Sequence, residues 1–178
     1  MAGTLAWTPA LDRPDLLADP VTAMLRSDPA TAGRVSVAEI DPGLADTAAF
    51  CDAYGVGLDV SANCVVLAAK RSGGVTALAA CLVLATTRAD VNGVARRALE
   101  ARKASFAPMD VAVAETGMEY GGITPLGLPP GWPILVDGAV AAAPEAVVGS
   151  GLRRSKLLLP GEVLAGLPGA VVLPGLGR

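Results

Sequence analysis

The sequence predicts an α+β fold, a single compact domain in which short helices pack on a curved, mixed β-sheet that is partly closed and barrel-like. The chain has 178 residues, a length that is typical of one domain. Short strand-like segments outnumber helical ones, and the chain has neither an internal repeat nor a heptad pattern. Aromatic residues make up only 3% of the composition, so the core is expected to consist of Ala, Val and Leu.

The N-terminal part of the chain is expected to form an arm, two helices and one strand. Residues 1–17 show no clear period and predict an arm, and Asp19-Pro20 is typical of a helix start. Residues 34–40 alternate between apolar and polar side chains, which predicts a strand. A short helix is predicted over residues 46–54, and Gly55 is expected to end it.

The rest of the chain predicts a hairpin, two helices, and then short strands with one last helix. Residues 64–69 and 75–84 are apolar runs on either side of a Gly-containing turn, as in a hairpin. Helical spacing predicts helices over residues 92–102 and from Pro108 to Gly117, and a short final helix over residues 162–167. The strand-like segments that follow Gly117 are residues 121–124, 134–136, 147–149, 156–159 and 170–173.

Histidine is absent from the sequence, and its absence excludes several catalytic arrangements. A Ser-His-Asp triad, a Cys-His dyad and a His-ligated metal are ruled out, and proton transfer near neutral pH loses its usual side chain. Ser150, in a Val-Gly-Ser-Gly segment, is not expected to be a nucleophile because it has no base to activate it. Any hydrolysis by this protein therefore has to proceed without imidazole.

The cysteines, Cys51, Cys64 and Cys81, lie in apolar stretches and form no Cys-x-x-Cys pair. The chain does not offer the four good ligands that a zinc site needs, so we expect no metal and no other cofactor. Buried structural thiols are the simpler interpretation, and a nucleophilic Cys64 is the alternative. Unpaired thiols, together with the lack of a recognisable secretory signal or membrane span, predict a cytoplasmic protein with no membrane partner.

The formal net charge is −3, so no general attraction to a polyanion is expected. Two local basic clusters are exceptions: one lies within residues 96–103, and the other consists of Arg153, Arg154 and Lys156. Each cluster is either a solvated face or a contact to nucleic acid, and the sequence does not decide between these interpretations.

Glycines gather in residues 116–128, which predicts a loop that approaches a ligand closely. The adjacent Gly121 and Gly122 carry no Cβ, and Pro125 stiffens the turn. Such a loop can present backbone N–H groups to a carbonyl or carboxylate oxygen and act as an oxyanion site without side-chain catalysts. The alternative is an ordinary Gly-Pro turn between two strands.

Six segments, read in order, resemble the YbaK-like family of editing domains associated with prolyl-tRNA synthetase. The most specific is residues 116–127, in which a Thr-Gly start runs into Gly-Gly-Ile-Thr-Pro-Leu-Gly. The others are DTAAFCDAYGVG at 46–57, SANCVVL at 61–67, RADVN at 88–92, ILVD at 134–137, and a glycine turn and tail from residue 147. The resemblance covers residues 34–178 as the editing domain, and residues 1–33 are expected to form an N-terminal arm and helix.

The resemblance implies a freestanding aminoacyl-tRNA deacylase, a hydrolase that acts in trans on the ester of mischarged tRNA, with tRNA(Pro) as the expected type. The loop backbone would hold the aminoacyl group while water or a substrate group attacks the ester carbonyl. The expected partners are the 3′ end of mischarged aminoacyl-tRNA and an aminoacyl-tRNA synthetase, and the expected state is a monomer or weak homodimer. The implied catalytic residues are Gly121, Gly122, Ile123, Thr124 and Pro125; those binding substrate are Asn63, Met118, Gly127, Asp137 and Gly151; those binding tRNA are Arg153, Arg154 and Lys156.

The sequence departs from the family pattern at Asn63, where members usually carry a lysine on the first long strand. Lys70 has the opposite parity to Asn63 on a regular strand, so it is not expected to take over that role. Asp137 has two interpretations: it anchors the pocket near the substrate amine, or it caps backbone N–H groups at the end of a strand. The missing lysine makes a catalytically weakened family member, which binds an aminoacyl or nucleotide ligand, the alternative to an active deacylase.

Overall fold

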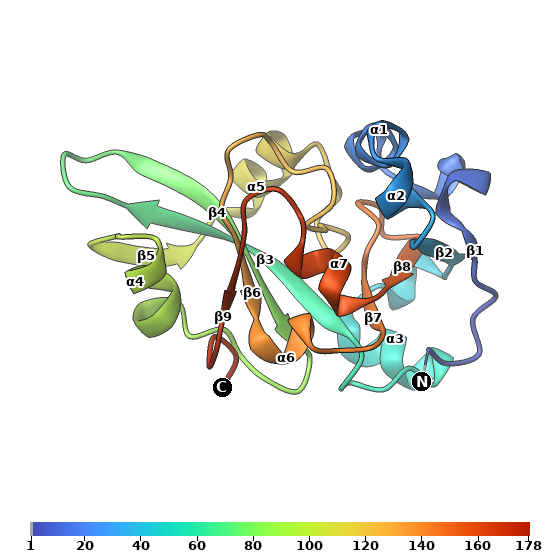
Figure 1. Ribbon diagram of the computed structural model, residues 1–178. Coiled ribbons are helices and arrows are strands. Elements are labelled where there is room, and N and C mark those ends of the chain that lie inside the picture. Colours follow the sequence, from blue (N-terminus) through green and yellow to red (C-terminus); the bar gives the residue numbers. More distant parts are fainter. Residues whose placement is uncertain (1) are drawn as a thin grey trace.

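The computed structural model describes residues 2–178 and shows two β-sheets with short helices around them (Figure 1). One sheet has four strands in the order β1 (Thr8–Pro9), β2 (Ser36–Glu39), β8 (Ser155–Leu159) and β7 (Ala146–Gly149), all antiparallel. The N-terminal segment therefore contributes an edge strand to this sheet. The predicted strands over residues 34–40, 147–149 and 156–159 are confirmed.

The second sheet has five strands and is mixed, as predicted. Its order is β5 (Lys103–Phe106), β3 (Ala62–Lys70), β4 (Thr76–Leu84), β6 (Ile134–Asp137) and β9 (Ala170–Leu173). The predicted hairpin is β3–β4, a nine-residue antiparallel pair that extends beyond the rest of the sheet in Figure 1. β6 pairs in parallel with both β4 and β9, because the chain crosses over to reach each of them.

The expectation of a partly closed, barrel-like sheet is wrong. The two sheets keep their own edges, and a single isolated bridge between Ser61 and Val147 joins them within the described residues. A closed barrel needs a continuous hydrogen-bonded ladder between all neighbouring strands. The nine-residue pairing of β3 and β4 and the four-residue pairing of β7 and β8 belong to separate ladders, and no ladder within residues 2–178 connects them.

The helices are short and cover the sheets. They are α1 (Asp19–Ser27), α2 (Pro29–Ala32), α3 (Thr47–Tyr54), α4 (Arg96–Ala98), α5 (Met109–Thr116), α6 (Gly138–Ala141) and α7 (Gly161–Ala165). Short 3-10 turns occur at Ala10–Asp12, Pro14–Leu16 and Pro42–Leu44, and a π-helical turn at Val91–Ala95 precedes α4. Gly55 and Gly117 end α3 and α5 in the left-handed conformation, at φ values of 64° and 66°, as predicted for both.

Two further sequence predictions need correction, and short elements were also missed. Residues 121–124 form no strand: Gly121 and Gly122 lie in a turn and the two residues after them have no regular structure, because glycines have no side chains to pack on a sheet. The helix predicted over residues 92–102 ends at Ala98, and the residues after it enter β5, which periodicity did not predict. The turn of helix α6 was also missed, since four residues are too few to show a helical period.

The largest apolar cluster lies between the four-stranded sheet, the inner face of the hairpin and α1. Val21 and Leu25 of α1 are fully buried in it, together with Leu82, Leu157 and Leu159. A second cluster fills the other face of the five-stranded sheet, and a third lies under α3. The division of the chain into residues 1–33 and 34–178 stays a prediction, and α1 packs in the same core as the strands of the second part.

Candidate active site

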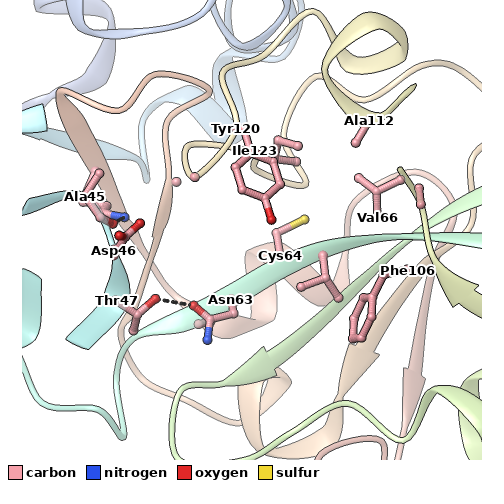
Figure 2. A pocket seen from close by; sticks show the side chains of 16 residues that line it. Ala45, Asp46, Thr47, Asn63, Cys64, Val66, Phe106, Ala112, Tyr120 and Ile123 are labelled. Atoms are coloured by element: carbon pink, nitrogen blue, oxygen red, sulfur yellow. Dashed lines mark hydrogen bonds between the residues drawn. The ribbon is translucent and has the colours of Figure 1, made fainter. Parts of the chain in front are cut away.

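A pocket of about 410 Å³ opens where the two sheets meet. Its walls come from the start of α3, the first half of β3, the end of β5 with the residue after it, helix α5, the glycine-rich loop and the facing ends of β7 and β8. Figure 2 shows the labelled side chains around it, with Asp46, Thr47 and Asn63 on one side and Val66, Phe106 and Ala112 on the other. One half of the pocket is therefore polar and the other apolar. This division suits a substrate with a polar reacting group and a small apolar substituent.

Asn63, for which the sequence predicts substrate binding, lies in the wall of this pocket. Its side-chain oxygen accepts a 2.6 Å hydrogen bond from the hydroxyl of Thr47 at the start of α3 (Figure 2). The amide nitrogen of Asn63 is left to donate elsewhere. Lys70 lies at the far end of β3 and is exposed, so it does not take over the role of a lysine at position 63.

Lys156 also lies in the pocket wall, and not in an exposed basic cluster as the sequence suggested. Only 8% of the residue is exposed. Its Nζ donates a 2.9 Å hydrogen bond to the carbonyl oxygen of Ala45 and lies 5.1 Å from the centroid of the Phe50 ring. Burial lowers the pKa of the Lys156 amine to about 8, and this effect is larger than the opposing attraction of Cys51 and Asp46. The sequence gave no sign of this placement, which depends on the pairing of β8 with β2 and β7.

The glycine-rich loop contributes Tyr120, Gly121 and Ile123 to the pocket. The N–H of Gly122 donates to the carbonyl oxygen of Glu119 at 2.9 Å, and its own carbonyl oxygen accepts from Gly151 at 2.7 Å. Within residues 2–178, the N–H groups of Gly121 and Ile123 have no hydrogen-bond acceptor. Both residues line the pocket, so these two unpartnered N–H groups are candidate donors for an oxyanion.

Gly122 is needed for packing rather than for contact with a ligand. A Cβ at this position would lie 2.6 Å from the backbone carbon and oxygen of Leu152, a distance that no real side chain adopts. Gly122 itself does not line the pocket. The close approach of these two backbone segments holds the loop in its place beside β7.

Several predicted site residues lie outside the pocket. Thr124 is fully buried, and Pro125 and Gly127 line a second cavity of about 730 Å³ on the other side of the loop. Met118 packs in the main core, and Gly151 forms a turn at φ 86° that leaves no room for a side chain beside Ala18. The loop therefore has two faces, and only the face with Gly121 and Ile123 reaches the pocket.

Asp137 is buried at the end of β6 and does not line the pocket. Its two carboxylate oxygens accept hydrogen bonds from the backbone N–H groups of Ala139, at 2.9 Å, and Gly177, at 2.8 Å. Of the two interpretations that the sequence left open, this geometry matches the capping one. The carboxylate fastens the start of α6 and the C-terminal segment to the sheet.

The two arginines next to Lys156 are more exposed than the lysine. Arg153 donates hydrogen bonds to the carbonyl oxygens of Tyr120 and Pro42 and lies 3.7 Å from a carboxylate oxygen of Asp46. It therefore connects the glycine-rich loop to the segment before α3, at the rim of the pocket. Arg154 is exposed and donates to the carbonyl oxygen of Asp15.

The thiols are held in their protonated form. Burial raises the pKa of the Cys64 thiol, which lines the pocket, and also that of Cys51. The pKa of the Cys81 thiol is raised to about 12, again mainly by burial. A nucleophilic thiolate needs the opposite shift, so the structure favours structural thiols over a cysteine nucleophile.

Sequence reasoning missed several residues of the pocket. Asp46, Thr47, Tyr120 and Phe106 all line it. Nothing local marks them: Asp46 and Thr47 are typical of an ordinary helix start, and Phe106 follows a mixed segment that contains Arg102, Lys103 and Ser105. Only the packing of α3 and β5 against β3 brings them to one cavity.

Comparison with known proteins places the chain in a family. Residues 41–167 match the model of the aminoacyl-tRNA editing domain, and the chain belongs to this family. A search of curated proteins gives no significant match. No helix within residues 2–178 is both long and apolar enough to cross a membrane, and these residues contain no group of three or more potential Cys, Asp or Glu metal ligands.

Solved structures show the same fold at low sequence identity. One, described as "a putative trans-editing enzyme for prolyl tRNA synthetase", is 22% identical, with a TM-score of 0.75 over 90% of this chain and 96% of that chain. A scaffold protein with a computationally grafted epitope is also 22% identical, with a TM-score of 0.73 over 90% of this chain and 97% of that one. A hypothetical protein is 18% identical, with a TM-score of 0.76 over 90% of this chain and all of that one.

Proposed function

We propose that this protein is a trans-acting aminoacyl-tRNA deacylase that hydrolyses the ester bond of mischarged tRNA, with tRNA(Pro) as the acceptor. The observation that carries the proposal is the pocket between β3 and the glycine-rich loop, where the N–H groups of Gly121 and Ile123 are unpartnered. Membership of the editing-domain family supports the reaction class. The neighbour described for prolyl tRNA synthetase supports the choice of acceptor.

The proposed mechanism uses positioning and backbone donors. The terminal ribose and its aminoacyl group enter the pocket, and the Gly121 and Ile123 N–H groups face the carbonyl oxygen that becomes negative during attack. Water attacks the ester carbonyl, assisted by a group of the substrate such as the terminal ribose hydroxyl. Each backbone donor of this kind lowers the barrier by about 2.7–4 kcal/mol.

Arg153 and Arg154 are proposed to contact the acceptor-stem phosphates. Both lie outside the pocket wall on the segment that leads into β8, where a tRNA whose 3′ end is inserted would pass. Arg153→Ala would also disturb the loop that it holds, so Arg154→Ala is the cleaner test. We expect Arg154→Ala to weaken tRNA binding and to reduce the slope of log K against log salt by about one.

The decisive experiment is a deacylation panel with alanyl-, cysteinyl-, seryl- and threonyl-tRNA(Pro), each compared with buffer alone. We expect turnover of at least one substrate. A matched substrate that ends in 2′-deoxyadenosine tests the assistance by the ribose hydroxyl and should be hydrolysed far more slowly. No turnover of any substrate would reject the deacylase and favour the alternative, a binding module, which the uncharged Asn63 in the pocket supports.

A further inference from the structure

We propose that Lys156 is a catalytic residue whose ammonium group donates a hydrogen bond to the carbonyl oxygen of the substrate ester and stabilises the oxyanion formed during attack. This inference rests on the proposed deacylase function and names a residue for it that no resemblance assigned to catalysis. Three observations carry it: the lysine is buried in the pocket wall, no carboxylate is paired with it, and its hydrogen-bonding capacity is not used up.

Burial without a carboxylate partner is the first sign of a functional amine. Lys156 is 8% exposed, and none of the ion pairs within residues 2–178 includes it. Asp46, at the same end of the pocket, is instead 3.7 Å from Arg153. A buried, unpaired ammonium is costly for folding, and such groups concentrate at functional sites.

The donor count of the ammonium leaves capacity for a ligand. A lysine ammonium has three N–H donors. One is used by the carbonyl oxygen of Ala45 at 2.9 Å, and the Phe50 ring, 5.1 Å away, presents its face to the cation without a hydrogen-bond acceptor. Within the described residues, Nζ has no other acceptor. The N–H groups that Ala45 does not use are therefore available to a group inside the pocket.

The position of Lys156 favours the ester carbonyl over a phosphate as the group it binds. In the proposed function the phosphates of the polynucleotide pass along the outer side of the pocket, where the more exposed Arg153 and Arg154 lie. Lys156 shares the pocket with Gly121 and Ile123, whose N–H groups lack acceptors. A charge in a buried site stabilises a developing oxyanion more strongly than one in water does.

The proposed step balances as a simple hydrolysis. The oxygen of water bonds to the ester carbon, and the electron pair of the C=O bond moves to the carbonyl oxygen, where Lys156 donates its hydrogen bond. The pair then returns, the bond to the ribose oxygen breaks, and that oxygen takes up a proton from the attacking water. Lys156 keeps its proton throughout, so the products are the free amino acid and tRNA with a free terminal hydroxyl.

The first experiment compares deacylation by wild type, Lys156→Met and Lys70→Met under single- and multiple-turnover conditions. Methionine has nearly the same shape as lysine without the charge, and Lys70 is the exposed control on β3. We expect Lys156→Met to lower kcat by about a hundredfold while KM changes by less than about threefold. Lys70→Met should match wild type. A Lys156→Met variant that folds, with a melting temperature at least as high as that of wild type, and keeps its kcat would overturn the proposal.

A second experiment detects the contact between Lys156 and a bound ligand without requiring turnover. The lysines of the chain are Lys70, Lys103 and Lys156, so [13Cε]lysine labelling gives three NMR signals that Lys→Met variants assign. The probe is 3′-alanylamino-3′-deoxyadenosine, an amide that the enzyme cannot hydrolyse by ester cleavage. We expect the Lys156 signal to shift on binding while Lys70 and Lys103 stay in place.

The two measurements separate the outcomes. If wild type shows no turnover but the amide probe shifts the Lys156 signal, the deacylase function fails and the contact stands. If wild type is active and the probe binds without moving Lys156, the function stands and this inference falls. Neither turnover nor probe binding would overturn both.

Discussion

The hydroxyl of Thr47 donates a 2.6 Å hydrogen bond to the side-chain oxygen of Asn63, and this contact joins the start of α3 to the pocket end of β3 (Figure 2). It fixes the orientation of the Asn63 amide, because the oxygen is held by Thr47 and the nitrogen is left to donate. A lysine at position 63 would lack this acceptor. The contact between α3 and β3 at this wall of the pocket therefore depends on an asparagine at position 63.

Thr47→Val should therefore impair the site without unfolding the protein. The change removes one hydrogen bond, worth about 1 kcal/mol net, and frees the Asn63 amide to rotate. We expect kcat/KM for the best mischarged tRNA to fall about fivefold, with a melting temperature within a few degrees of wild type. Thr76→Val, at an exposed position of β4, is the matched control and should leave both values unchanged. Equal activities of the two variants would contradict the role given to Thr47.

Lys156→Met should change how stability depends on pH. Burial lowers the pKa of Lys156 from 10.5 to about 8, so between these values the unfolded chain binds a proton that the folded protein does not. The free energy of unfolding of wild type, relative to Lys156→Met, therefore rises with pH from about 8 to 10.5. The gain is about 3 kcal/mol, since each pKa unit corresponds to about 1.4 kcal/mol.

Denaturant titrations of both proteins at several pH values measure this difference. The cysteines have raised pKa values, so they lower the free energy of unfolding of both proteins as pH rises. This shared contribution cancels when the free energy of unfolding of Lys156→Met is subtracted from that of wild type. Cys51, Asp46 and Arg153 are the charged or titratable neighbours of Lys156, and they are present in both proteins. A difference that stays flat across this range would show that the amine is not desolvated.

Gly122→Ala should destabilise the protein by about 2 kcal/mol, a typical cost of overpacking. The added Cβ would lie 2.6 Å from the backbone of Leu152, which cannot rotate away as a side chain would. Gly33→Ala is the matched control, because its Cβ would meet the nearest atom, the Pro29 carbonyl oxygen, at an ordinary 3.5 Å. Thermal unfolding of both variants checks the prediction, and equal melting temperatures would refute the close approach of the loop to Leu152.

The thiols should react slowly with an aromatic disulfide reagent at neutral pH. The raised pKa of Cys81, about 12 instead of 9, lowers its thiolate fraction about a thousandfold, and burial acts in the same direction on Cys51 and Cys64. We expect full reaction of the three thiols only after unfolding in guanidinium chloride. A thiol that reacts in the native protein as fast as free cysteine would restore the cysteine-nucleophile hypothesis.

The sequence predicted most of the elements, because their signals are local. Glycine at positions 55 and 117 ended α3 and α5 as expected, and the apolar runs on either side of residues 71–74 formed the β3–β4 hairpin. Sheet closure was not predictable in the same way. It depends on the lengths over which strands pair, and these emerge only when segments distant in sequence come together.

For the candidate site, the sequence determined the chemistry that is available, and the tertiary structure decided which residues supply it. The absence of histidine, the glycine-rich loop and the asparagine at position 63 are properties of the chain itself. That Gly121 faces the pocket while Gly127 faces another cavity is a result of packing on both sides of one loop. Lys156 reads in the sequence as one of three neighbouring cations, yet the alternation along β8 turns it inward toward Ala45 and Phe50, where burial changes its chemistry.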